Sequence, residues 1–292
     1  MSSVLYDAAG PRARRNIRIG TAVGVLLLVG LALIVLNRLG SNGQLEAERW
    51  KILTNPDLQE LLGRALLRTL QAAAIAMVLS MVIGALLAAG RLSERSWVRT
   101  PVTVFVELFR ALPLLLLILF AALALPQLGL RFSVLWYLVI GLTAYNSAVL
   151  SEIFRAGILS IDRGQSEAAY AIGLRPGEVL RLILVPQAVR RMLPALISQL
   201  VTLLKDTSLG FVIAYDELLR TGRGAVEFLG SRFAFQVYVA VALIYIAVNF
   251  ALSTFARWLD RRQTRRYGAG AVVVDPEDPL GQEKLVTAGA PR

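Results

Sequence analysis

Five polar side chains fall between Leu193 and Asp206, in the first half of an apolar stretch that runs from about Leu193 to Leu218. They are Ser198, Gln199, Thr202, Lys205 and Asp206. On a helix, Ser198, Thr202 and Lys205 lie within about 60° of one another, and Gln199 and Asp206 share a neighbouring face. Such a stripe suits a translocation path, with Lys205 meeting a carboxylate and Asp206 meeting an ammonium group. Alternatively, Lys205 and Asp206 lie near the end of an interrupted helix and only cap or brace it.

Other polar side chains occur in two further apolar stretches. Asn146 and Glu152 are too far apart around a helix to share a face, so at most one of them lines a path. We expect that residue to be Asn146, and we expect Glu152 to pair with Arg155. Glu107 and Arg110 are three residues apart, a spacing that predicts a local ion pair bracing one end of its helix.

The composition places these residues in a membrane protein. The chain of 292 residues is 56% hydrophobic and only 17% charged, outside the usual soluble range. Its apolar runs are unbroken over roughly twenty residues, which predicts helices rather than a barrel. The sequence has no Cys and no His, which removes disulfides, the commonest proton shuttle and the commonest metal ligand. We therefore predict an all-α polytopic membrane protein that binds no metal and no cofactor of its own.

Six apolar stretches are long enough to cross a bilayer as helices. They cover about 19–37, 66–89, 101–125, 132–153, 193–218 and 235–258. Pro113 predicts a kink within the third span. The first span is longer than the apolar core of a signal peptide and no small-residue cleavage site follows it, so we expect it to be retained.

The spans divide the chain into regions. A basic N-terminus covers residues 1–18, the first span 19–37, a transmembrane domain 64–262, and a Gly-, Pro- and acid-rich tail 263–292 that we expect to be disordered. The net charge of +11 comes from basic residues at span ends, which excludes nucleic-acid binding as its reason. These residues cluster before the first span, over 91–110, over 154–191 and after 260, so both termini and the loop 154–191 are expected in the cytoplasm.

The central part of this loop is the polar stretch GQSEAAYAIGLRPGEVL, which begins at Gly164 and separates two apolar stretches. The pattern predicts a helix over Gly164–Ile172, with Glu167 in the first turn and Gly173 at its end. Ala168 and Ala169 give this helix a small-residue surface that can approach another protein closely.

A second short helix is predicted over Gly177–Leu184. Pro176 fits its first position, and Pro186 is expected to end it. Physical reasoning alone leaves open whether this helix–turn–helix recognises a partner or merely caps the bundle.

The segment EAAYAIGLRPGEVLRLILVP resembles the loop signature of permease subunits of ABC importers: EAA, three residues, Gly, nine residues, Ile, any residue, Leu-Pro. The matching positions are Glu167, Ala168, Ala169, Gly173, Ile183 and Pro186, and Val185 stands where the signature has Leu. The blocks ELFRALP, SEIFRAGILSIDRGQSEAA, PQAVR and LLKDTSL are similar to the polar amino acid branch of that family, and the resemblance extends over about 64–262. The extra N-terminal span and the segment AYNSAVLSEIFRAG resemble those of glutamate-type permeases of Gram-positive bacteria.

The resemblance implies a type I importer core of five spans, preceded here by an extra N-terminal span. It implies that the two short helices, including Gly164 and the signature residues, form a coupling helix that docks into a cytoplasmic ATPase dimer. That ATPase would use ATP and Mg. The other implied partners are a second permease subunit, copy or paralogue, and an extracytoplasmic binding protein, in a bacterial cytoplasmic membrane. The cargo would be a polar amino acid, moved by alternating access.

The motor is expected in another chain, since the sequence contains no G-x-x-x-x-G-K-[ST]. Two alternatives stay open. One is an ion-gradient-driven secondary transporter, although the sequence has no internal repeat of the kind such transporters often show. The other is an ABC permease for a different small zwitterion such as an opine.

Overall fold

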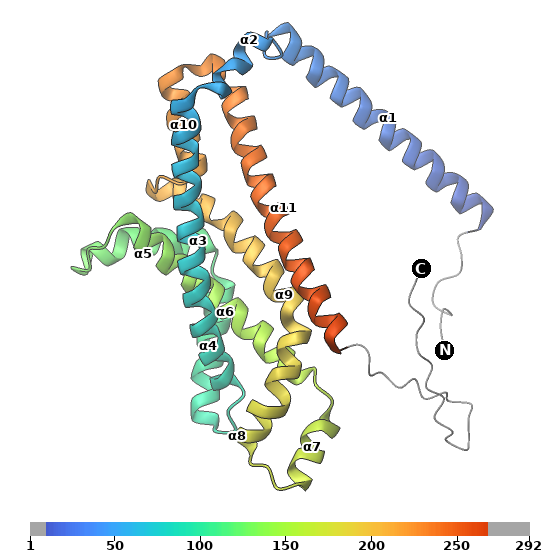
Figure 1. Cartoon of the computed structure of the whole chain (residues 1–292), viewed down its shortest axis with the longest axis vertical. Coiled ribbons are helices and arrows are strands. Elements are labelled where there is room, and N and C mark those ends of the chain that lie inside the picture. The colour runs from blue at the N-terminus through green and yellow to red at the C-terminus, as the bar shows by residue number, and fades with distance from the viewer. Residues whose placement is uncertain (1–9, 268–292) are drawn as a thin grey trace. The chain divides into compact units, whose positions relative to one another are not determined.

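The computed structural model describes residues 10–267, all of whose regular elements are helices (Figure 1). Five helices are long and apolar enough to cross a membrane, and a sixth span results if one bent pair is counted as a single span. The five are Pro11–Ser41, Pro56–Arg91, Val134–Leu159, Pro176–Ile213 and Ser231–Phe255. The tail beyond residue 267, for which we expected disorder, lies outside the described residues, as do residues 1–9.

The chain divides into two compact units, Met1–Gly63 with Gly222–Val241, and Arg64–Thr221 with Ala242–Arg292. The first unit contains α1 (Pro11–Ser41), α2 (Ala47–Trp50) and the 3₁₀ helix Lys51–Thr54. None of the residues of α1 is buried. Gln236 donates to the backbone oxygen of Gln44 over 2.9 Å, and the rings of Trp50 and Phe235 meet edge to face.

The helix α3 (Pro56–Arg91) begins about ten residues before the predicted second span. The reason is local, because the side chain of Asn55 accepts hydrogen bonds from the backbone N–H groups of Asp57 and Leu58 and so caps the helix. Pro56 then occupies a position at which a missing N–H group does no harm.

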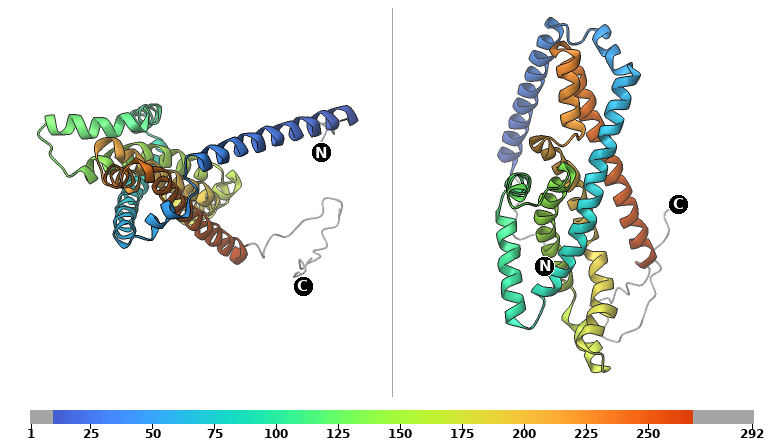
Figure 2. Two further views of the ribbon diagram at one scale, coloured as in Figure 1. Left: turned by 90° about the horizontal axis from the view of Figure 1, so that it is seen from above. Right: turned by 90° about the vertical axis from the view of Figure 1, so that its left-hand side faces the viewer.

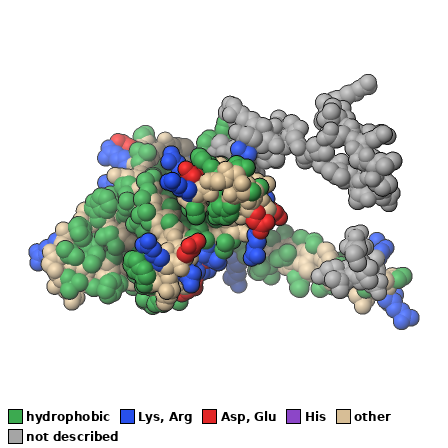
Figure 3. All heavy atoms as spheres, turned by 90° about the horizontal axis from the view of Figure 1, so that it is seen from below, with side chains coloured by type: hydrophobic (Ala, Val, Ile, Leu, Met, Phe, Trp, Pro, Cys, Tyr) green, Lys and Arg blue, Asp and Glu red, His purple; other side chains and the backbone are tan. Residues whose placement is uncertain are grey.

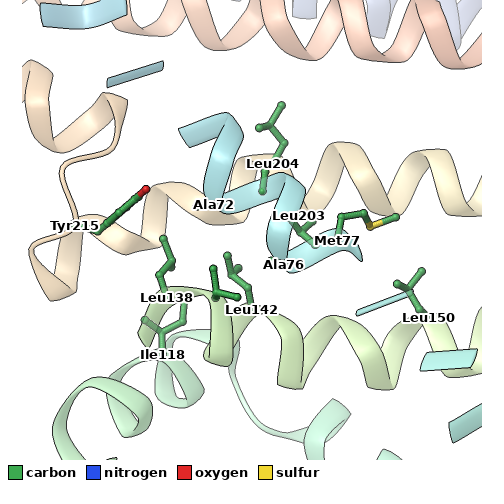
Figure 4. Packing of buried hydrophobic residues seen from close by; sticks show 12 residues of the cluster. Ala72, Ala76, Met77, Ile118, Leu138, Leu142, Leu150, Leu203, Leu204 and Tyr215 are labelled. Carbon is green, nitrogen blue, oxygen red and sulfur yellow. The ribbon is translucent and has the colours of Figure 1, made fainter. Parts of the chain in front are cut away.

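The core of the second unit is formed by α3, α6 (Val134–Leu159) and α9 (Val185–Asp206). Leu138, Leu142 and Leu150 of α6 are fully buried, and Leu203 and Leu204 of α9 lie against the same cluster (Figure 4). The contribution of α3 to this core consists largely of small residues at four-residue spacing, a pattern that lets helix backbones approach closely in a membrane. They are Ala72, Ala76, Ser80, Gly84 and Ala88.

The helices α3 and α6 approach each other closely at Gly84. A Cβ atom there would lie 2.9 Å from the backbone oxygen of Ser147 and 3.0 Å from the Cβ atom of Leu150. A side chain at this position would therefore push the two helices apart.

The predicted third span is broken rather than kinked. The helices α4 (Ser96–Ala111) and α5 (Leu114–Gln127) meet at 99°, so that in the right-hand view of Figure 2 α5 is seen nearly end-on above α4. Pro113 explains the position of the break, because a proline disfavours helical geometry at the residue before it, and Leu112 is extended, with a ψ of 136°.

The helix–turn–helix is present, with one correction. α7 (Arg163–Ala171) is followed by Gly173 at a φ of +85°, and Pro176 opens α8 (Pro176–Glu178), as expected. The prediction that Pro186 ends the second helix is wrong. Residues Val179–Leu184 form a π-helical turn that leads directly into α9, with Pro186 in the first turn of α9. Pro186 has no backbone N–H group and cannot donate the hydrogen bond of a regular α-helix. The wider π-helical turn before it accommodates this missing bond.

The predicted fifth span ends early. α9 stops at Asp206, a 3₁₀ helix covers Thr207–Ile213, and Leu218 already belongs to the unpredicted helix α10 (Leu218–Leu229). The predicted sixth span is present and longer, since α11 runs over Ala234–Tyr267.

Candidate path and coupling loop

The polar stripe of α9 lies on one exposed face of that helix. Ser198, Thr202 and Lys205 are all exposed, as their spacing predicts. The Ser198 hydroxyl donates to the backbone oxygen of Pro194, and the Thr202 hydroxyl donates to that of Ser198, each over 3.0 Å. Both hydroxyl oxygens keep acceptor capacity on the open side of the helix.

Lys205 and Asp206 form the last turn of α9. Within the described residues, neither side chain makes a hydrogen bond or an ion pair with another residue. A cation stabilises the C-terminal end of a helix, but a carboxylate there is unfavourable. The alternative that both residues only cap the helix therefore accounts for Lys205 and leaves the half-buried Asp206 unexplained.

Gln199 and Asn146 bind each other instead of facing the open side. The Gln199 amide donates to the Asn146 side-chain oxygen over 2.6 Å, and the Asn146 amide donates to the backbone oxygen of Leu142 over 2.8 Å. Asn146 is fully buried. The structure thus places Asn146 in the contact between α6 and α9 and away from the exposed stripe, and its role in the path stays a prediction.

A network of ion pairs joins the ends of α3, α4 and α6. The expected local pairs are present, Glu107 with Arg110 at 3.5 Å and Glu152 with Arg155. Sequence reasoning missed the residue that connects them. Arg91, whose side chain is 8% exposed, lies 2.7 Å from Glu152 and 3.1 Å from Glu107. Its only sequence signal was its position at the end of an apolar run.

The α7–α8 hairpin, which we define as Arg163–Leu184, presents an exposed surface. Tyr170 and Ile172 are 49% and 79% exposed. Ala168 is exposed too, whereas Ala169 is buried, so only part of the predicted small-residue surface is open. Glu167 is exposed in the second turn of α7 rather than the first, because the side chain of Asp162 caps the helix by accepting from the backbone N–H group of Gly164.

This hairpin is bonded to α9, and so is the C-terminal end of α6 that precedes it. The Gln187 amide of α9 donates to the Gln165 side-chain oxygen over 3.2 Å, and Arg191 donates to the backbone oxygen of Ser160. Gly157 of α6 leaves room for Met192, which a Cβ atom would approach to 2.9 Å. Displacement of α7 would therefore be transmitted to α9. Seen from this end, the surface carries hydrophobic, basic and acidic side chains together (Figure 3).

In the part of the chain that the structure describes, no three Asp, Glu, His or Cys side chains come together in a way that could hold a metal ion. The candidate functional site has three parts, which are the exposed stripe of α9, the two unpaired charged residues at its end and the exposed α7–α8 hairpin.

Comparison with known proteins agrees with this geometry. Residues 80–265 match the family described as binding-protein-dependent transport system inner membrane component. The chain is 38% identical over 249 residues to the glutamate transport system permease protein GluD of Corynebacterium glutamicum, covering 82% of this chain and 89% of that protein. It is 42% identical over 198 residues to a probable glutamine ABC transporter permease of Bacillus subtilis, covering 67% and 90%.

A solved structure of similar fold is an amino acid ABC transporter crystallised with histidines. Its permease chain superimposes with a TM-score of 0.67 at 27% identity, covering 72% of this chain and 97% of that chain. The family match begins at residue 80 and so does not reach the N-terminal helix α1.

Proposed function

Since the chain belongs to the family of binding-protein-dependent transport system inner membrane components, we propose that it carries glutamate or a similar polar amino acid through the membrane. It is the permease subunit of an ABC importer, and the ion-gradient alternative does not account for this family membership. The broken pair α4–α5 has counterparts in secondary transporters, but a break of this kind is not specific to them.

The observation that carries the substrate proposal is the pair of charged residues at the end of α9. Lys205 and Asp206 are without ionic partners among the described residues, and Lys205 ends an exposed face of hydroxyl groups. Charged groups in a membrane span are expensive unless they serve a function. An α-amino acid supplies the two complementary charges, and the names of the relatives, a glutamate and a glutamine permease, support an acidic or amide side chain.

The proposed mechanism is alternating access driven by a separate ATPase. The exposed Tyr170 and Ile172 of the α7–α8 hairpin would dock into the ATPase, and its hydrogen bond to Gln187 would transmit movement to α9. ATP and Mg would be used in the ATPase and not in this chain. Two ATPase subunits need two docking hairpins, which supports a second permease subunit, either a copy or a paralogue.

The proposed orientation places the hairpin in the cytoplasm of a bacterial cell. The support is the concentration of Arg residues in the hairpin loop and around Arg91 and Arg110, on the expected positive-inside side of the spans. The opposite side of the membrane would then receive a loaded binding protein.

The experiment is uptake of radiolabelled glutamate by the complete transporter in proteoliposomes, with Lys205→Ala against the control Lys51→Ala. Lys51 pairs with Glu48 on the surface, where such pairs contribute little. We expect at least a tenfold loss of uptake for Lys205→Ala, from the loss of a charge-assisted contact, and no loss for Lys51→Ala. Equal uptake by both variants would contradict the role of Lys205, and competition by excess glutamine or an opine would identify a different cargo.

A further inference from the structure

A buried carboxylate occupies the end of the second unit opposite the α7–α8 hairpin. Glu217 is fully buried, and its oxygens accept from the backbone N–H groups of Leu219 and Arg220, each over 2.7 Å. The third donor is the hydroxyl group of Tyr245 in α11, at 2.8 Å. One carboxylate thus joins the start of α10 to α11.

The same segment is held to α3 by three further contacts. The Tyr215 hydroxyl donates to the backbone oxygen of Arg68 over 3.0 Å, and the backbone N–H group of Leu218 donates to the Thr69 hydroxyl over 3.1 Å. Arg68 also lies 3.4 Å from Asp216. Glu217 and its neighbours therefore bind this segment to two different helices.

Burial of a carboxylate is not needed to cap a helix. An exposed Asp, Ser or Asn caps equally well, whereas a buried charge has a desolvation penalty that its contacts offset only in good geometry. An ordinary stabilising role leaves the burial of Glu217 unexplained. Polar contacts that join separate helices can, however, be made in one conformation and broken in another.

The segment between α9 and this carboxylate contains a strained joint. Ala214, at a φ of +65°, is the single non-glycine residue with positive φ among the described residues. On one side of it Gly210 lies against α6, where a Cβ atom would approach Leu138 to 2.8 Å. On the other side lies Glu217. Strain of this kind persists where the surroundings impose it and is common in segments that move.

We propose that Glu217 and Tyr245 form a latch that holds the segment Thr207–Glu217, which directly follows Lys205 and Asp206, against α3 and α11, and that the latch opens when these two residues become accessible from the Glu217 side. Lys205 and Asp206 directly precede this segment, so release of its far end would free the turn that carries them to move. Glu217 is in this sense a positioning residue that does not touch the substrate. The inference rests on the proposed function, because it concerns access to the proposed substrate path.

The test uses the absence of cysteine from the chain. Ser208→Cys places a reporter in the segment, and a membrane-impermeant thiol reagent is added from the Glu217 side to the complete transporter, with partner subunits free of accessible cysteine. The labelling rate is compared with and without ATP. Tyr245→Phe removes the hydroxyl donor alone, and Tyr238→Phe, a half-exposed tyrosine of the same helix, is the matched control.

The latch predicts that Tyr245→Phe raises labelling without ATP by about tenfold, the scale of a lost charge-assisted hydrogen bond, while Tyr238→Phe has no effect. Glu217→Gln retains an acceptor and should give an intermediate labelling rate. This variant provides the test if the transporter with Tyr245→Phe does not assemble. A purely structural role would lower thermal stability without changing the ratio of the two labelling rates. Unchanged ratios in both variants would overturn the latch, whereas uptake that does not need ATP would overturn the proposed function instead.

Discussion

The guanidinium group of Arg91, at the end of α3, lies 2.7 Å from the carboxylate of Glu152 in α6. This contact is nearly closed to solvent on the arginine side, with the Arg91 side chain 8% exposed, and it links two helices that also carry the core of the second unit. The arrangement of α3, α4 and α6 at this end of the second unit therefore depends on one buried cation, Arg91, between Glu152 and Glu107.

Arg91→Ala should destabilise the protein by roughly 2–4 kcal/mol, because it leaves two carboxylates without their shared cation. Thermal unfolding in mild detergent measures the change. The control is Arg99→Ala, an exposed arginine of α4, for which a change within about 0.5 kcal/mol is expected. Equal stability of the two variants would show that the network is not structural.

Two glycines of α3 should respond to alanine with opposite signs. Gly63 is exposed and a Cβ atom there would meet nothing within 4 Å, so Gly63→Ala should stabilise the helix by about 0.5–1 kcal/mol. Gly84→Ala should destabilise the protein by about 1–3 kcal/mol, since the new methyl group would contact Ser147 and Leu150 at 3 Å or less. The same sign for both variants, measured by unfolding in detergent, would contradict the close contact of α3 and α6.

Gly173 should be sensitive to backbone strain and insensitive to size. Its φ is +85° and a Cβ atom would have open space around it, so Gly173→Ala imposes only the strain of left-handed geometry, about 1 kcal/mol. Asn tolerates this geometry better. We expect ATP-driven uptake and recovery of the ATPase on affinity purification to fall for Gly173→Ala and to be largely retained for Gly173→Asn. Full function of Gly173→Ala would contradict the coupling role.

Glu217 predicts a pH dependence of stability. Burial raises the pKa of Glu217 above its ordinary value, against the opposing effect of its hydrogen bonds to Leu219, Arg220 and Tyr245. The folded state then holds this proton to higher pH than the unfolded state, so the contribution to stability is complete below the ordinary pKa of 4.5 and is lost as the pH rises through the raised value.

The comparison that isolates this group is wild type against Glu217→Gln. Asp216, Arg68, Arg220 and Tyr215 also face the site and titrate or carry charge in both proteins. The unfolding temperature of the wild type should fall relative to Glu217→Gln as the pH is raised above 4.5. A relative rise would mean that the hydrogen bonds outweigh burial.

The sequence was sufficient for the elements with strong local signals. Pro113 predicted a kink at the place where α4 and α5 are in fact separated by a break, and Gly173 correctly predicted the end of α7, because each residue restricts its own backbone or that of a neighbour. The exposed face shared by Ser198, Thr202 and Lys205 followed from helical spacing alone.

Other features depend on contacts between distant segments. Hydropathy does not distinguish the end of α9 from the 3₁₀ helix after it, since Leu209 to Ile213 are as apolar as the helix itself. The bond between Gln199 and Asn146 and the role of Arg91 depend on how α3, α6 and α9 pack. Pro186 was misjudged because the π-helical turn before it has no simple sequence signature.

The most direct test of the central claim is affinity purification of the tagged chain from its native membrane in mild detergent, with mass spectrometry of the proteins that accompany it. We predict recovery of a P-loop ATPase in an amount equal to that of the tagged chain, since docking to an ATPase is the role that we propose for the exposed α7–α8 hairpin. If the chain is recovered alone and still exchanges an amino acid across vesicles without ATP, the assignment of this hairpin to an ATPase is contradicted.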